Sequence, residues 1–263
     1  MADVFHGVSD RPWIFRGLLP TLGIDPGERP RMRLATHTRG DGERAALLVH
    51  GVAALHRTWH AVEDTLVERG YRVIGVDLRG HGRSPRGEYS MEALRQDLVD
   101  TLPAGADLVM GHSIGCVALS QALDHLRPDR AVYIDPAFWI PPMPEEGARR
   151  LRRVLATADA AQVRELHPRW SEQDVRIELE GFAAADPEFL TWTGREVAGV
   201  DNFPKAAEVP TLAVIAGEGS PIGSDGARTL AERGFTVRTI EGAGHCVHRD
   251  DLPGLLSTLE GWI

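Results

Sequence analysis

The pentapeptide Gly-His-Ser-Ile-Gly at residues 111–115 constrains the fold more than any other part of the chain. It follows an apolar run (107–110) that predicts a buried strand and leads into a run (114–126) that predicts a helix. A strand that becomes a helix within one residue strains the backbone there, and side chains two positions away on either side would collide with the neighbouring strand and helix. The pattern therefore predicts a sharp turn that exposes the hydroxyl of Ser113, with the amide of Ile114 facing the same space.

Strand-like and helix-like runs alternate along the chain, which predicts an α/β fold with a mostly parallel, doubly wound sheet. The expected strands are 31–38, 45–50, 71–77, 107–110, 131–135, 211–216 and 235–240. The expected helices of the core are 56–69, 91–102, 114–126, 225–233 and 252–262.

One long segment interrupts this alternation. Residues 138–205 show helical pattern without a strand, including a Ser171 and Asp174 spacing typical of a capping box. We expect this segment to be a helical cap inserted between core strands, over the carboxyl edge of the sheet where open α/β sheets place their sites. The core would then comprise 31–137 and 206–263, and residues 1–30 an N-terminal extension of unclear role.

Charge and apolar runs exclude several function classes. The chain has 29 basic and 38 acidic side chains and a net charge of -9, so it lacks the electrostatic footprint of a nucleic-acid or anionic-membrane binder. Its apolar runs of about five residues are far shorter than the roughly 18 that span a bilayer, and its first residues do not resemble a secretory signal. Cys116 and Cys246 are too few for a disulfide scaffold or an unaided metal site. We expect a cytoplasmic monomer or homodimer that acts on a small-molecule substrate without a cofactor.

Four blocks, in order along the chain, resemble the α/β-hydrolase superfamily. They are Leu47–Gly51 (LLVHG), Val76–Ser84 (VDLRGHGRS), the GHSIG turn and Gly242–His245 (GAGH). The resemblance covers nearly the whole chain from about residue 31 onward. It implies a serine nucleophile at Ser113 and an oxyanion hole formed by the amides of Val52 and Ile114. A serine at this turn argues against the superfamily's haloalkane dehalogenases and epoxide hydrolases, which use an aspartate there.

The resemblance also implies a general base at His245, in the Gly-rich loop after the last expected strand. A neutral imidazole there can take the serine proton at neutral pH and return it to the leaving group. His248 lies three residues later, but only His245 matches the block. We expect His50, His81 and His112 to make structural hydrogen bonds rather than to take part in catalysis.

The acid of the implied triad is where the chain departs from the superfamily. Members most often carry an aspartate in the loop after the strand that corresponds to 211–216, and Ser220 occupies that position here. A serine cannot stabilise an imidazolium as a carboxylate does. Other members place the acid after the strand that precedes the cap, where this chain has Asp135. We expect Asp135 to be the acid, with Glu218 and Asp225 as alternatives, although an aspartate before a proline also caps turns.

The expected cap holds seven of the 16 aromatic side chains of the chain. We expect Phe138, Trp139, Trp170 and Trp192 to contact an apolar part of the substrate. Helices that pack on a sheet also need aromatic anchors, so packing alone would give the same enrichment. The arginines at 149, 150, 152 and 153 predict a solvated helix face rather than a carboxylate clamp.

These features favour a serine hydrolase that cleaves an ester, lactone or thioester of a small, largely apolar molecule through an acyl-enzyme. A C–C bond hydrolase or an acyltransferase would use the same triad. A ligand-binding member of the superfamily with an impaired triad is the alternative outside enzymes, and Ser220 is the feature that supports it.

Overall fold

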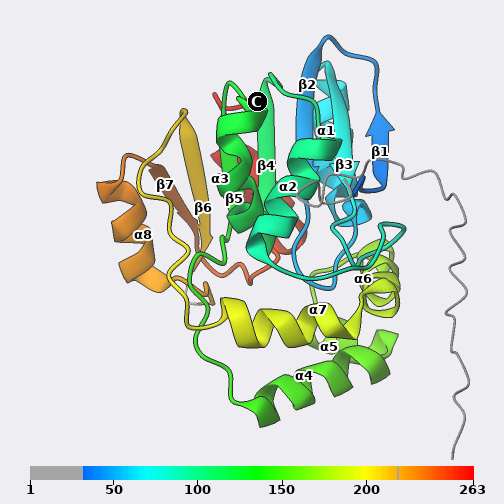
Figure 1. Ribbon diagram of the computed structural model, residues 1–263. Coiled ribbons are helices and arrows are strands. Elements are labelled where there is room, and N and C mark those ends of the chain that lie inside the picture. The colour runs from blue at the N-terminus through cyan, green and yellow to red at the C-terminus, as the bar shows by residue number, and fades with distance from the viewer. Residues whose placement is uncertain (1–31, 218) are drawn as a thin grey trace, which may run out of the picture. The chain divides into compact units, whose positions relative to one another are not determined.

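The computed structural model describes residues 32–217 and 219–263 (Figure 1). The expected extension at 1–30 and the alternative acid Glu218 lie outside these residues. No described helix is both long and apolar enough to cross a membrane.

Seven strands form one sheet in the order β1-β3-β2-β4-β5-β6-β7. The strands are β1 (Thr36–Arg39), β2 (Arg44–Val49), β3 (Tyr71–Val76), β4 (Leu108–His112), β5 (Ala131–Ile134), β6 (Thr211–Ala216) and β7 (Thr236–Ile240). Every pair is parallel except β1 with β3. The central strands are continuous apolar runs because helices cover both of their faces. The mostly parallel, doubly wound sheet expected from the sequence is confirmed.

Successive residues of β2 divide between two hydrophobic cores. Leu47 and Val49 belong to one core, and Ala46 and Leu48 to the other. The first core packs against α2 (Met91–Thr101), α3 (Ile114–Leu126) and α8 (Gly223–Glu232). The second packs against α1 (His60–Glu68), α9 (Val247–Asp250) and α10 (Leu252–Thr258), with the short 3-10 helix η1 (His56–Trp59) leading into α1.

The first strand starts later than the sequence pattern predicts. The expected strand at 31–38 is observed only from Thr36. The amide of Leu34 donates to the hydroxyl of Thr101, and that of Ala35 donates to the hydroxyl of Ser84. Side chains therefore satisfy backbone groups that a longer strand would pair with its neighbour.

Between β5 and β6 the described chain forms helices and no strand. This segment contains α4 (Glu145–Thr157), α5 (Ala160–Leu166), α6 (Glu172–Ala184), α7 (Pro187–Trp192) and a π-helical turn, η2 (Thr193–Val197). The predicted capping box is present at the start of α6, where Ser171 and Asp174 bond reciprocally. Figure 1 shows α4 to α7 grouped at one end of the sheet. We keep the name cap for residues 138–205.

Candidate active site

The turn between β4 and α3 has the strained geometry that its sequence predicts. Ser113 has φ 55° and ψ -123°, outside the regions that ordinary residues prefer. A Cβ added to Gly115 would lie 2.5 Å from the carbonyl oxygen of His50 and 2.6 Å from that of Val49. A Cβ added to Gly111 would lie 3.0 Å from the Cα of Cys116. Glycine is therefore required at both positions, and Ser113 stands at the tip of the turn.

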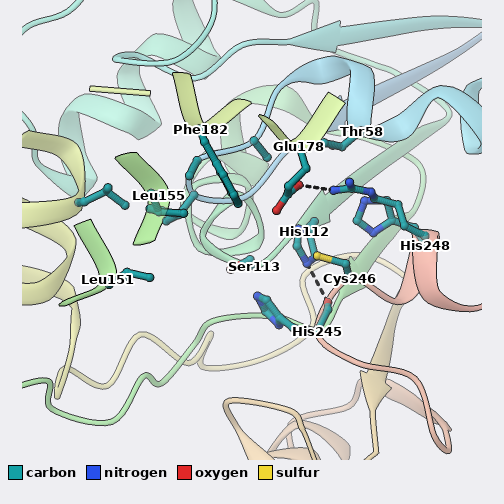
Figure 2. A pocket seen from close by; sticks show the side chains of 15 residues that line it. Thr58, His112, Ser113, Leu151, Leu155, Glu178, Phe182, His245, Cys246 and His248 are labelled. Carbon is teal, nitrogen blue, oxygen red and sulfur yellow. Dashed lines mark hydrogen bonds and ion pairs between the residues drawn. The ribbon is translucent and has the colours of Figure 1, made fainter. Parts of the chain in front are cut away.

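His245, in the loop after β7, meets Asp135, which follows β5. Its Nδ1 lies 2.5 Å from Oδ2 of Asp135. The Asp135 carboxylate is fully buried, and its Oδ1 accepts a hydrogen bond of 3.0 Å from the amide of Ala216. With Nδ1 engaged, Nε2 of His245 is the nitrogen left to exchange a proton. Ser113 and His245 line the same cavity, and Figure 2 shows them on the same side of it.

The other carboxylates considered as the acid do not share this arrangement. Asp225 is exposed on α8, where it pairs with Arg228 at 2.7 Å, and Glu218 lies outside the described residues. Ser220, at the position where an acid is usual, has a buried hydroxyl with no hydrogen-bond partner among the described residues. Among these carboxylates, the structure brings Asp135 to His245.

The two backbone amides expected to form an oxyanion hole are available. Val52 lines the cavity, and Ile114 is the first residue of α3. Neither amide has a hydrogen-bond acceptor within the described part of the chain. The next amide, that of Ala53, donates to Nε2 of His81 at 3.0 Å, and Ala53 itself has φ 54°. This bond holds the loop that carries Val52 in place, and the N-terminus of α3 adds a favourable dipole for an anion.

His50 and His81 have structural roles, as expected. His50 accepts a hydrogen bond of 2.9 Å from the amide of Leu78, and its Nδ1 bonds a backbone carbonyl at 2.7 Å. His81 likewise bonds one amide and one carbonyl. Burial lowers the pKa of His50 to about 4 and the pKa of His81 to about 3. Both rings are therefore neutral at physiological pH, with one nitrogen donating and the other accepting.

His112 and His248 form a second layer behind His245. Nε2 of His112 bonds the backbone carbonyl of His245 at 2.9 Å (dashed in Figure 2), which fixes the loop carrying the expected base. The ring of His248 stacks on Trp59 at 4.6 Å and packs edge-on against His112 at 4.8 Å. Burial and the charge of Arg249 hold the pKa of His248 well below its usual range. Neither ring nitrogen of His248 has a partner among the described residues.

The cavity above Ser113 has a volume of about 230 Å³. The cap contributes four apolar residues to its lining, Leu151, Leu155, Phe182 and Leu190. Its polar side comes from Thr58, Glu178, His112, His248 and Arg249. The apolar positions were not predicted as site residues. The shared helical face that Leu151 and Leu155 form with Val154 was the signal in the sequence that could have found two of them.

The four aromatic residues expected to contact the substrate do not line this cavity. Phe138 and Trp192 are buried in the core that joins the cap to the sheet. Trp170 is buried, and its Nε1 donates to Asp250 at 2.7 Å. Trp139 is exposed. Three of these aromatic side chains are therefore buried by packing and one lies at the surface, and none of them forms part of the cavity wall.

An ion-pair cluster that the sequence did not reveal connects the cap to the loop of His245. Arg249, on α9, donates to the carboxylate of Glu178 at 2.6 Å and to the backbone carbonyl of Asp174 at 2.8 Å, both on α6. Its guanidinium lies 3.4 Å from the centroid of the Trp170 ring. The Arg249 side chain is almost fully buried, so these contacts replace its hydration. No cluster of potential metal ligands occurs among the described residues.

Comparison with known proteins gives consistent results. The chain is 30% identical over 241 residues to the esterase YbfF of Escherichia coli, and the match covers 82% of this chain and 92% of that protein. It is 38% identical over 95 residues to a putative carbamate hydrolase, RutD, of Variovorax paradoxus, and this match spans 34% of the chain and only 35% of that protein. Among solved structures, an N-formylmaleamic acid deformylase of Pseudomonas putida has a TM-score of 0.72 at 23% identity, covering 86% of this chain and 96% of the other, which shows the fold.

A family model also matches most of the chain. Residues 46–254 match the alpha/beta hydrolase family, which is well over half of the chain. The sharp turn at Ser113, the strands β3 to β7 and the loop of His245 all fall inside this range. The chain therefore belongs to the alpha/beta hydrolase family and is a hydrolytic enzyme.

Proposed function

We propose that the chain is a serine hydrolase that cleaves an ester, lactone or thioester of a small, largely apolar molecule through an acyl-enzyme. The observation that carries the proposal is the 2.5 Å contact between His245 and the buried carboxylate of Asp135, beside a cavity that Ser113 also lines. In this arrangement Ser113 is the nucleophile, His245 the general base and Asp135 the acid.

The first half-reaction follows from these positions. The hydroxyl oxygen of Ser113 attacks the carbonyl carbon while Nε2 of His245 takes its proton. Asp135 accepts from Nδ1–H and stabilises the imidazolium that forms. The amides of Val52 and Ile114 donate to the oxyanion, and loss of one such donor in other hydrolases costs about 2.7–4 kcal/mol. The tetrahedral intermediate collapses when His245 returns the proton to the leaving group.

The second half-reaction uses the same groups. A water molecule gives a proton to Nε2 of His245 and attacks the acyl carbonyl, and the oxyanion is held by the same two amides. His245 then protonates the oxygen of Ser113, which leaves as the hydroxyl and releases the acid. The apolar side chains Leu151, Leu155 and Phe182 support an apolar acyl group in this cavity. The likeness to an esterase over most of the chain favours ester cleavage over C–C bond cleavage or acyl transfer.

Steady-state hydrolysis of 4-nitrophenyl butanoate tests the proposal. We expect the wild type to turn over and Ser113→Ala to lose activity by roughly 10³-fold or more. Ser120→Ala is the matched control, because Ser120 lies on the same helix and its hydroxyl donates to the carbonyl of Val117. Absence of turnover by the wild type, or activity retained by Ser113→Ala, contradicts the proposal.

A further inference from the structure

A second cavity, of about 390 Å³, lies in the cap beside the cavity of Ser113. We call the cavity of Ser113 the inner cavity and this one the outer cavity. Two residues, Glu178 and Phe182, line both. They are four positions apart on α6 and therefore lie one turn apart on the same face of the helix. This face of α6 is the wall that the two cavities share, and Figure 2 shows both side chains at the inner cavity.

Large apolar side chains remain exposed around these cavities. Not one residue of α4 is buried. Leu151 is 39% exposed and lines the inner cavity, while Val154 (43%) and Leu166 (69%) line the outer one. Scattered exposed leucines are ordinary, but a group of them around a hollow next to a reactive serine is typical of a ligand-binding surface.

The volumes of the two cavities also support a ligand-binding site that includes both. The inner cavity alone, at about 230 Å³, is smaller than the roughly 300–1,000 Å³ typical of ligand pockets, and the two cavities together fall within that range. The phenyl ring of Phe182 has discrete alternative rotamers on a helix, so a rotation of this side chain opens the shared wall without moving the backbone.

The carboxylate of Glu178 is directed away from the opening that rotation of Phe182 makes between the two cavities. Its Oε2 accepts a hydrogen bond of 2.6 Å from Arg249, which draws the carboxylate towards α9. The remaining part of the wall is the apolar ring of Phe182. A neutral hydrocarbon chain can therefore pass on the side of Phe182.

We propose that the outer cavity is an extension of the acyl site, and that the enzyme takes esters whose acyl chain is a medium-length to long hydrocarbon. The carbonyl of the ester lies at Ser113, the chain passes Phe182, and its far end lies against Val154 and Leu166. This inference rests on the proposed function, because it assigns the acyl group of the same acyl-enzyme.

The test compares kcat/KM for 4-nitrophenyl decanoate and 4-nitrophenyl butanoate. Val154→Trp fills the outer cavity from a half-exposed position, so the fold tolerates it. We expect it to lower the decanoate-to-butanoate ratio of kcat/KM by roughly tenfold or more, the effect of losing the burial of about two methylenes. Leu166→Arg, at a more exposed position on α5, is expected to act in the same direction.

Two further variants complete the design. Arg153→Trp places the same side chain at an exposed position of α4 that lines neither cavity, and it should leave the ratio unchanged. Phe182→Ala opens the shared wall and should raise the ratio. If Val154→Trp and Leu166→Arg leave the ratio at the wild-type value while butanoate is hydrolysed, the inference is wrong and the proposed function stands. If the wild type hydrolyses neither ester, both fail.

Discussion

The two hydrogen bonds of Asp135 predict the effect of replacing it by asparagine, which has the same shape. In the wild type, Oδ1 accepts from the amide of Ala216 and Oδ2 accepts from Nδ1 of His245. In Asp135→Asn the carbonyl oxygen of the amide keeps the bond from Ala216, so its NH₂ group faces His245. Nδ1 must then accept rather than donate, which puts the ring proton on Nε2. In that tautomer His245 cannot take the proton of Ser113.

The size of the effect follows from the alternative arrangement. If the asparagine flips to restore the productive tautomer, its NH₂ group faces the amide of Ala216, and a buried donor without an acceptor costs about 1–3 kcal/mol. The imidazolium also loses the negative charge that stabilises it in the transition state. We therefore expect kcat to fall by about 10⁴-fold, the loss seen when another serine hydrolase carries asparagine in place of this acid. At 1.36 kcal/mol per decade this is about 5 kcal/mol.

The assay is steady-state hydrolysis of 4-nitrophenyl butanoate, with thermal unfolding to verify that the variant is folded. Asp225→Asn and Glu218→Gln are the controls, because these are the other carboxylates that the sequence allows as the acid. Both should remain within about threefold of the wild type. Activity of Asp135→Asn within tenfold of the wild type, or a large loss in either control, would refute the reasoning.

Three predictions concern stability. Gly115→Ala should lower the free energy of unfolding in urea by about 2–3 kcal/mol or more, since its Cβ meets two backbone carbonyls, whereas Gly219→Ala, which has open space, should be near neutral. Burial lowers the pKa of His50 to about 4, so the unfolded state binds more protons than the folded state between about pH 6.5 and pH 4, and stability falls as the pH is lowered through this window. His50→Gln should reduce that slope by up to about 1.4 kcal/mol per pH unit, and an unchanged slope would show that His50 titrates normally. Arg249→Met removes the cation that neutralises carboxylates on α6 and should cost about 3 kcal/mol, against about 0.5 kcal/mol or less for the exposed Arg228→Met; equal effects would contradict the role given to burial.

Much of the fold and part of the candidate site could be predicted from local patterns. The turn at Ser113 needs glycines at fixed spacing, and continuous apolar runs identify buried parallel strands, so both are visible in the sequence. Asp135 was predicted because Ser220 leaves the usual acid position without a carboxylate, and the structure brings Asp135 to His245. That its carboxylate acts as the acid stays a proposal until the variants are measured.

The lining of the cavity could not be predicted in the same way. A helical pattern shows which residues of the cap share an apolar face, but what that face meets depends on how the helices pack in three dimensions. Trp170 and Trp192 were expected to contact the substrate because the cap is rich in aromatic residues, but both pack away from the cavity. Phe182, which does line the cavity, was not predicted as a site residue. Arg249 and Glu178 form an ion pair although they lie 71 positions apart in the sequence. In the sequence alone, each looks like an ordinary solvent-exposed charged residue.

The central claim is that Ser113 is an activated nucleophile, and covalent labelling tests it most directly. The wild type is incubated with a fluorophosphonate, digested, and the modified peptide is sequenced by mass spectrometry. We predict one adduct on Ser113, no adduct in Ser113→Ala, and slower labelling in Asp135→Asn, because the base is then in the wrong tautomer. An unlabelled wild type, or an adduct that persists in Ser113→Ala, would contradict the account.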